Sequence, residues 1–229
     1  MENNSSIIIK EVNKNIIITP KDNIYTKVII FLHGFGDKPN SYIQLFNNEK
    51  MLLFPKTKIL LLSAPIIPIT YYKGEMISSW FDLFDEGFDD KSKYNFNDVE
   101  KNSSNIYKII IAEGKRLQGK YENIFIGGFS QGACIALNIG LSFGNLLGGI
   151  ICCSGFLFPQ TEINKDNQNI KIFAGHGYVD KVIKCEFSQE SFERIKNFPN
   201  FHFKIYKDLD HIIGIEELED IKQFLEKNI

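Results

Sequence analysis

The sequence lacks the excess of positive charge that a nucleic-acid-binding protein usually carries. Its 26 basic and 28 acidic side chains give a formal net charge of −2, and the basic residues form no stripe or cluster. Tight binding to a phosphate backbone depends on clustered Lys and Arg side chains. We therefore expect no nucleic-acid partner.

Long hydrophobic runs and an export signal are missing as well. The longest apolar stretches, residues 59–69 and 146–158, are interrupted by proline or glycine, and neither approaches the roughly 20 apolar residues that span a bilayer. Residues 1–10 lack the charged and then apolar segments of a secretory signal, and Glu2 stands where N-myristoylation requires glycine. We therefore expect a cytoplasmic protein without a transmembrane segment.

Paired cysteine motifs are also absent. No C-x-x-C pair occurs among the four cysteines, Cys134, Cys152, Cys153 and Cys185. Three of them lie in apolar sequence, and the adjacent Cys152 and Cys153 on one strand would point to opposite faces. We expect reduced, structural thiols, and we predict neither a metal site nor a cofactor.

What the sequence does contain is a regular alternation of short apolar runs with helical patterns. Runs typical of buried strands occupy residues 27–32, 58–63, 123–127, 147–154, 170–174 and 201–206. Helical patterns occupy residues 41–54, 98–117, 131–143, 188–197 and 215–227, and Asn97 with Glu100 resembles a capping box. Such alternation implies right-handed crossovers and a mostly parallel, doubly wound α/β sheet. A chain of 229 residues, 44% of them hydrophobic, suits one domain over residues 1–229.

Two further segments complete the predicted architecture. The β-branched runs at residues 7–9 and 16–19 predict an N-terminal antiparallel hairpin at the edge of the sheet. Residues 64–97 fit neither a strand nor a helix, yet they are too apolar for disorder, and long loops are usually functional. We expect this segment to form a wall of the substrate site, with Ile69, Tyr72, Met76 and Trp80 as substrate-binding residues. The alternative is that it covers the edge of the sheet.

A candidate nucleophile lies in the run G-F-S-Q-G at residues 128–132, which has the pattern G-x-S-x-G. An apolar run ends at Gly127 before this pattern, and a helical run starts at Ala133 after it. A turn between a strand and a helix can present a serine side chain, and glycines beside it allow two chain segments to approach closely. We therefore predict that Ser130 is a nucleophile and not an incidental serine in a glycine-rich turn.

A serine nucleophile needs a histidine to remove its proton, and the chain has four. His211 lies between the strand pattern 201–206 and the last helical pattern, as the chain order Ser, Asp, His requires. His202 alternates with phenylalanines on a strand pattern, and His33 is expected to brace the loop that follows it. His176 is expected in a loop close to the site but outside it. We predict His211 as the base.

Asp180 is the predicted acid. It follows the strand pattern 170–174, where the chain order places this residue. Asp208 and Asp210 compete because they are close in sequence to His211, but a carboxylate adjacent in the chain rarely reaches the imidazole Nδ1 with good geometry. Asp180 would fix the tautomer of His211 and stabilise the imidazolium.

Two backbone N–H groups are predicted to form an oxyanion hole. One donor usually comes from the residue after the nucleophile and the other from the loop after an early strand. These positions are Gln131 and Phe35. Glycines on both sides of Phe35 allow the backbone to turn its donors towards the site.

Six sequence blocks together resemble the acyl-protein thioesterase, or lysophospholipase-carboxylesterase, family of the α/β-hydrolase superfamily. They are H-G-F-G-D at 33–37, S-A-P at 63–65 with P-I-T at 68–70, S-W-F-D at 79–82, G-F-S-Q-G at 128–132, H-G at 176–177 with Asp180 and Val182, and His211. The blocks follow that family's order and span most of the chain.

The resemblance implies an α/β-hydrolase without a large cap domain that cleaves acyl thioesters of S-palmitoylated proteins. Its triad falls on Ser130, Asp180 and His211, and its oxyanion donors on Phe35 and Gln131. Phe35 replaces a frequent leucine, which narrows the pocket, and Asp210 replaces a frequent glycine beside the base.

The implied partner is an acylated protein or a lipid ester, reached through transient contact with a membrane surface. Within enzymes, the alternative is a carboxylesterase or lysophospholipase acting on small or lipid esters. Outside enzymes, the alternative is an inactive acyl-binding module.

Overall fold

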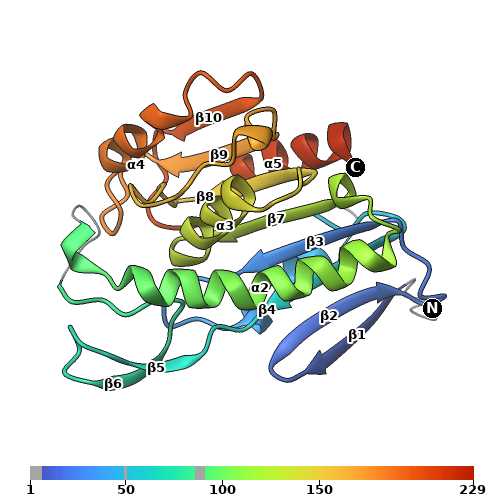
Figure 1. The fold of residues 1–229 in the computed structure, drawn as a ribbon, viewed down its shortest axis with the longest axis horizontal. Helices are drawn as coiled ribbons and strands as arrows, with labels where there is room; N and C mark the ends of the chain where they lie inside the picture. The colour runs from blue at the N-terminus through green and yellow to red at the C-terminus, as the bar shows by residue number, and fades with distance from the viewer. Residues whose placement is uncertain (1–6, 49–50, 86–90) are drawn as a thin grey trace.

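One mixed sheet of eight strands forms the centre of the structure, a computed structural model that describes residues 7–48, 51–85 and 91–229 (Figure 1). The strands are β1 Ile7–Val12, β2 Asn15–Pro20, β3 Lys27–Leu32, β4 Thr57–Leu62, β7 Ile124–Phe129, β8 Gly149–Cys153, β9 Ile172–Gly177 and β10 Phe201–Tyr206. Their order in the sheet is β1-β2-β4-β3-β7-β8-β9-β10. β2 pairs antiparallel with β1 and β4, and all other neighbours are parallel. The predicted N-terminal hairpin and mostly parallel sheet are confirmed.

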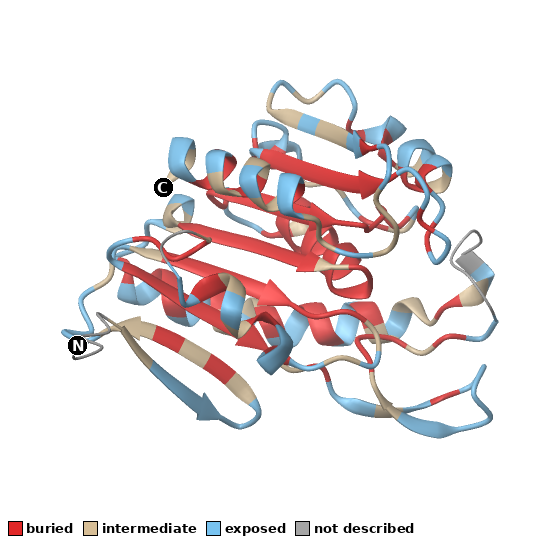
Figure 2. Cartoon of the chain, turned by 180° about the vertical axis from the view of Figure 1, so that it is seen from behind, coloured by how far each residue is buried: buried red, intermediate tan, exposed pale blue. Residues whose placement is uncertain are grey.

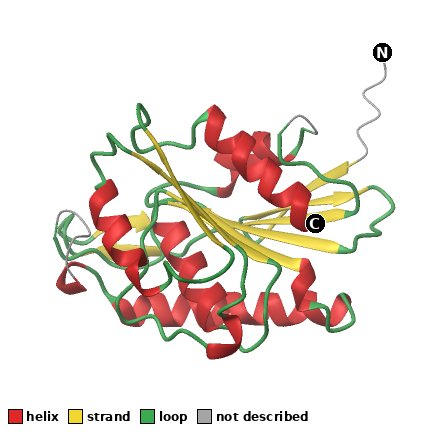
Figure 3. Ribbon diagram, turned by 90° about the horizontal axis from the view of Figure 1, so that it is seen from above, coloured by secondary structure: helices red, strands yellow, loops and turns green. Residues whose placement is uncertain are grey.

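Helices cover both faces of this sheet (Figure 3). They are α1 Ile43–Phe46, α2 Phe96–Arg116, α3 Gln131–Ser142, α4 Cys185–Ser191 and α5 Ile215–Asn228. Alternate residues of β3 enter two separate cores: Ile30 packs with residues of α2 and α3, and Ile29 packs with residues of α1 and α5. The central strands are therefore buried on both faces, whereas β1 at the edge is largely exposed (Figure 2). Cys152 and Cys153 enter opposite cores, as expected.

The predicted helix at residues 41–54 is wrong. A 3₁₀ turn at Pro39–Tyr42 leads into α1, which ends at Phe46, and the chain then folds back so that the N–H of Leu52 donates to the carbonyl of Leu45. The apolar residues that suggested one long helix enter the core from the 3₁₀ turn, from α1 and from the turn that follows. Residues 49–50 lie outside the described part.

The other helices differ from the prediction mainly at their ends. The predicted helix at 188–197 is α4 followed by a 3₁₀ turn at Phe192–Arg194. The N-cap of α2 is Asn95, whose side chain accepts the N–H of Asn97, so the cap lies two residues before the predicted one and Asn97 belongs to the helix itself.

Residues 64–97 contain regular structure that the sequence did not predict. β5 Ile66–Ile69 and β6 Glu75–Ser78 form a separate antiparallel hairpin, and Leu83 pairs with Tyr94 in an isolated bridge. Residues 86–90 of this segment lie outside the described residues. No large cap domain covers the sheet within the described ranges. No helix there is both long and apolar enough to cross a membrane.

Candidate active site

Ser130 lies at the sharp turn between β7 and α3. Its φ of 54° and ψ of −122° form a combination that a residue with a side chain adopts only under local constraint. A Cβ on Gly128 would clash with the backbone of Gly132, and a Cβ on Gly132 would clash with the carbonyl oxygen of Leu32. The two glycines therefore allow α3 to start against the ends of β7 and β3, which holds Ser130 at the carboxyl edge of the sheet.

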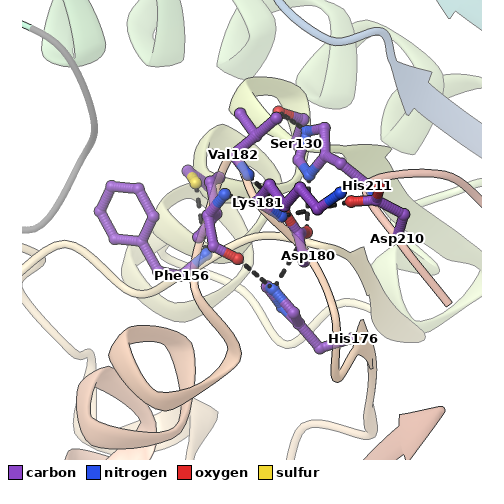
Figure 4. A network of polar contacts seen from close by, with 10 residues as sticks. Ser130, Phe156, His176, Asp180, Lys181, Val182, Asp210 and His211 are labelled. Carbon is purple, nitrogen blue, oxygen red and sulfur yellow. Dashed lines mark hydrogen bonds and ion pairs between the residues drawn. The ribbon is translucent and has the colours of Figure 1, made fainter. Parts of the chain in front are cut away.

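His211 connects Ser130 to Asp180 in a continuous line of contacts (Figure 4). Its Nε2 lies 2.8 Å from Ser130 Oγ, and its Nδ1 lies 2.7 Å from Asp180 Oδ2. The side chain of Asp180 is fully buried, and that of His211 is partly exposed. A carboxylate at Nδ1 holds the ring proton there, so Nε2 is left to accept the serine proton. The structure thus brings together the three residues that the sequence nominated, while Asp208 lies outside this line of contacts.

The carboxylate of Asp180 is held from four directions. Its Oδ1 accepts the N–H groups of Val182 at 2.8 Å and Ile183 at 2.9 Å. Its Oδ2 faces His211 and also His176, whose Nε2 lies 3.2 Å away. Burial by itself raises the pKa of Asp180, but the hydrogen bonds from His176, His211 and Ile183 outweigh burial and hold its pKa well below the usual range. The carboxylate is therefore ionised at neutral pH.

The backbone N–H groups of Phe35 and Gln131 belong to the loop after β3 and to the start of α3, the two segments that meet at Ser130. Gln131 is the first residue of α3, where the helix carries a partial positive charge. A Cβ added to Gly34 would lie 3.4 Å from the Cβ of Ser130, so the loop before Phe35 passes directly beside the serine. Neither N–H donates to a protein acceptor among the described residues. Both therefore remain candidates for the donors of the predicted oxyanion hole.

Buried side chains connect the loop after β3 with the start of α3, and the sequence did not predict this connecting role. Gln131 Oε1 accepts the N–H of Trp80 at 2.8 Å, and Gln131 Nε2 donates to the carbonyl of Phe81 at 3.0 Å. The indole Nε1 of Trp80 donates to the carbonyl of His33 at 2.8 Å. Residues 79–81 therefore tie the start of α3 to the loop that carries Phe35. The only sign of this role in the sequence was that S-W-F-D at 79–82 and G-F-S-Q-G at 128–132 both belong to the blocks that carry the family resemblance.

His33 braces its own loop, as expected. Its Nδ1 donates to the carbonyl of Gly34 at 2.7 Å, and its Nε2 accepts the N–H of Ala64 at 3.0 Å. Burial lowers the pKa of His33, which favours the neutral ring that this pair of bonds needs.

Comparisons with known proteins agree with this geometry. The family model described as Phospholipase/Carboxylesterase matches residues 13–229. Acyl-protein thioesterase 1 of Candida albicans is 33% identical over 213 residues, which is 88% of this chain and 91% of that protein. Acyl-protein thioesterase 1 of Saccharomyces cerevisiae is 31% identical over 89% of this chain and 93% of that protein. The crystal structure of Arabidopsis thaliana SOBER1 has a TM-score of 0.78 at 27% identity and covers 88% of this chain and 98% of its own.

The chain belongs to the phospholipase/carboxylesterase family. This family member is accordingly a hydrolase with the α/β-hydrolase fold. Among the described residues, no three His, Cys, Asp or Glu side chains gather in a way that could hold a metal ion.

The pocket of this phospholipase/carboxylesterase family member has a volume of about 630 Å³ and reaches Ser130 and His211. Its walls are mostly apolar and include Phe35, Tyr71, Tyr72, Leu83, Phe129, Val182 and Phe187. The ring of Phe35 stacks on that of Tyr72, with 5.9 Å between ring centroids. The loop after β3 and the β5–β6 hairpin therefore meet over the pocket.

Three of the four predicted substrate-binding residues do not line this pocket. Tyr72 does, but Ile69 and Trp80 are buried in the main core, and Met76 is exposed on β6. For Ile69 and Met76, the alternation of side chains along the hairpin strands explains why they lie outside the pocket. The β5–β6 hairpin points its alternate residues into the core or into solvent, so only the residues at its turn and the chain beyond it reach the pocket.

The predicted position of His176 is wrong as well. It lies on β9 and not in a loop, because this strand extends to Gly177 and not only to residue 174. Its ring is fully buried and contacts Asp180. His202, by contrast, is exposed on β10, in agreement with the prediction.

Proposed function

We propose that this chain is a serine hydrolase that cleaves acyl thioesters of S-palmitoylated proteins through an acyl-enzyme on Ser130. The observation that carries the proposal is the unbroken line from Ser130 Oγ through His211 to Asp180, at one side of a pocket with apolar walls. The relatives named acyl-protein thioesterase 1, at 33% and 31% identity, support this choice of substrate.

Acylation begins when Ser130 Oγ attacks the thioester carbonyl carbon while His211 Nε2 takes the hydroxyl proton. Asp180 stabilises the imidazolium that forms, and the N–H groups of Phe35 and Gln131 hold the oxyanion. Collapse of the tetrahedral intermediate breaks the C–S bond, and the imidazolium returns its proton to the leaving cysteine sulfur. The acyl group is then bound to Ser130 as an ester.

Deacylation repeats these steps with water as the nucleophile. His211 removes a proton from the water as its oxygen attacks the ester carbonyl carbon. The same backbone donors hold the second oxyanion. The C–O bond to Ser130 then breaks, Oγ takes the proton from His211, and the fatty acid leaves.

The surroundings of the pocket suit a lipid-bearing substrate. Tyr71, Tyr72 and Val182 line the pocket and are also exposed at the surface. An apolar rim of this kind supports transient contact with a membrane surface, where the acylated protein is presented. We place the protein in the cytoplasm on the ground that its four cysteines are buried as free thiols.

Replacement of the proposed nucleophile tests the reaction type. Ser130→Ala should lower kcat by on the order of 10⁶-fold, because removal of one triad member abolishes the covalent route. A fluorophosphonate probe should label the wild type and not the variant. Thermal unfolding of both proteins serves as the control for folding. Labelling of Ser130→Ala, or retention of a tenth of the activity, would rule out the assignment.

Substrate choice needs a separate measurement. The ratio of kcat/KM for a palmitoyl-cysteine peptide to that for a short-chain oxyester reports differential transition-state binding. We expect the thioester to be preferred. A preference for the short ester would favour the alternative, a carboxylesterase for small esters, and would leave the role of Ser130 intact.

A further inference from the structure

His176 is a buried titratable side chain that the proposed reaction does not use. It lies on β9, directly before the loop that carries Asp180. Its Nε2 lies 2.8 Å from the carbonyl oxygen of Ile183 and 3.2 Å from Oδ2 of Asp180 (Figure 4). One ring nitrogen thus contacts both ends of the short segment 180–183.

The protonation state of His176 follows from its partners. A carbonyl oxygen only accepts hydrogen bonds, so Nε2 must carry a proton. Nδ1 is also buried, and no hydrogen-bond partner for it lies within the described ranges. A second proton on Nδ1 would be a buried donor without an acceptor, which is costly. The geometry therefore accommodates a neutral ring with its proton on Nε2.

We propose that His176 is a positioning residue whose Nε2–H fixes Oδ2 of Asp180 and, through this carboxylate, the ring of His211. The inference rests on the proposed function. It extends the line Ser130–His211–Asp180 by one residue, to a second histidine that touches neither the substrate nor the serine.

Loss of the contact with His176 would change how the carboxylate of Asp180 is held. Asp180 has about four lone-pair directions, and the donors around it are Val182, Ile183, His211 and His176. Without His176, Oδ2 keeps only the bond to His211. The carboxylate can then rotate about its Cβ–Cγ bond, and more negative charge remains on the oxygen that faces the imidazolium.

Three other titratable side chains lie near this pair. Glu217 on α5 interacts electrostatically with His176, and Cys185 on α4 interacts with Asp180. Asp210 accepts the backbone N–H groups of Lys181 and His211. Burial raises the pKa of Glu217 to about 7, so this carboxyl group titrates in the pH range of a histidine base. A pH study of His176 should therefore be made both in the wild type and in a Glu217→Gln background.

Two substitutions at His176 distinguish the loss of the N–H donor from a change in side-chain packing. His176→Leu removes the donor, whereas His176→Gln keeps an N–H donor near the position of Nε2. His202→Leu is the matched control, because His202 is exposed on the adjacent strand β10. Active sites are counted by fluorophosphonate labelling, so that kcat refers only to folded enzyme.

The Leu variant should lower kcat by about 10- to 100-fold, the equivalent of one hydrogen bond to a charged group. KM should stay within about twofold. The acid limb of kcat/KM should move to higher pH by about half a unit or more, because Oδ2 then stabilises the imidazolium more strongly. His176→Gln should recover most of kcat and the original acid limb. Equal losses in the Leu and Gln variants, with an unmoved acid limb, would show that His176 only fills space.

Nitrogen-15 NMR of the wild type tests the tautomer without any substitution that affects folding. The shifts of His176 should show a protonated Nε2 and a bare Nδ1 at the pH of maximum activity. A bare Nε2 would overturn the proposal even if the Leu variant failed to fold. Absence of Ser130 labelling in the wild type would instead count against the proposed function, so the two failures are distinguishable.

Discussion

Asp210 joins two loops that carry different parts of the site. Its Oδ1 accepts the N–H of Lys181 at 3.2 Å and that of His211 at 2.9 Å. The first donor follows Asp180, the proposed acid, and the second belongs to His211, the proposed base. The carboxylate next to His211 therefore acts on the backbone of both loops and does not replace Asp180 at Nδ1.

Asp210→Gly should loosen both loops and lower the rate constant of acylation of Ser130 by about tenfold, which is the effect expected from the loss of one charge-assisted hydrogen bond. Asp210→Asn keeps an acceptor oxygen and should lose less. The measurement is single-turnover acylation of Ser130 by a chromogenic ester. A glycine variant as fast as the wild type would mean that the two loops hold their geometry without this clamp.

Gln131 has a structural role beyond its backbone N–H. Its fully buried amide serves both the N–H of Trp80 and the carbonyl of Phe81. Gln131→Ala should therefore lower the free energy of unfolding by about 2–3 kcal/mol, because buried groups lose their partners. Gln131→Met keeps most of the volume and should lose a similar amount in urea unfolding. Recovery of stability in the Met variant would attribute the loss to a cavity instead.

The residues differ in how far sequence could predict them. Ser130, Asp180 and His211 follow from one motif and one chain order, since each lies after a strand of a parallel sheet. His176 could not be placed, because its contact with Asp180 depends on where β9 ends. Trp80 was assigned to the pocket from its apolar character, which does not distinguish a wall from a core.

The start of α3 shows how elements constrain each other. Gly132 lies against the carbonyl oxygens of Leu32 and His33, which are backbone atoms that cannot move aside. Gly132→Ala should therefore cost at least about 2 kcal/mol of stability and displace Ser130. Gly144→Ala is the control, because no atom lies within 4 Å of an added Cβ there, and its effect should stay within about 0.5 kcal/mol. Equal unfolding midpoints for the two variants would contradict the close approach of α3 to β3.

Predictability also differs among the elements. The strands β3 and β10 lie at the bounds that their apolar patterns indicate. The pattern at 41–54 indicated one helix because its apolar spacing is helical, but α1 ends at Phe46 and a turn places Leu52 in the same core. Periodicity reports which side chains are buried, and not how the backbone between them runs.

At the scale of the whole molecule, the site collects residues that are distant in sequence at one edge of the sheet. Ser130 follows β7, Asp180 follows β9 and His211 follows β10. In a parallel sheet with right-handed crossovers the carboxyl ends of these strands face the same way, so the site follows from topology. The details of the pocket wall do not follow from topology, because the packing of the β5–β6 hairpin depends on tertiary contacts.

Glu217 lies on the first turn of α5, and its side chain is buried against Gly175 of β9. Neither carboxyl oxygen has a hydrogen-bond partner among the residues that the structure describes. Burial raises the pKa of Glu217 from 4.5 to about 7, and the nearby Cys153, Gly214 and His176 offset only part of this rise. The folded protein therefore keeps this proton to a higher pH than the unfolded chain does.

Glu217 should make the protein less stable as the pH rises. Between pH 4.5 and about 7 the unfolded state binds fewer protons than the folded state, so the free energy of unfolding falls with pH and levels off above that range. The rise from 4.5 to about 7 is about 2.5 units, which corresponds to about 3 kcal/mol. Glu217→Gln removes the titration, so its stability relative to the wild type should increase by about this amount across the range. Urea unfolding at several pH values measures the difference, with the exposed Glu219→Gln as the control. A difference that did not change with pH would mean that Glu217 is already ionised in the folded protein, with a partner that compensates its burial.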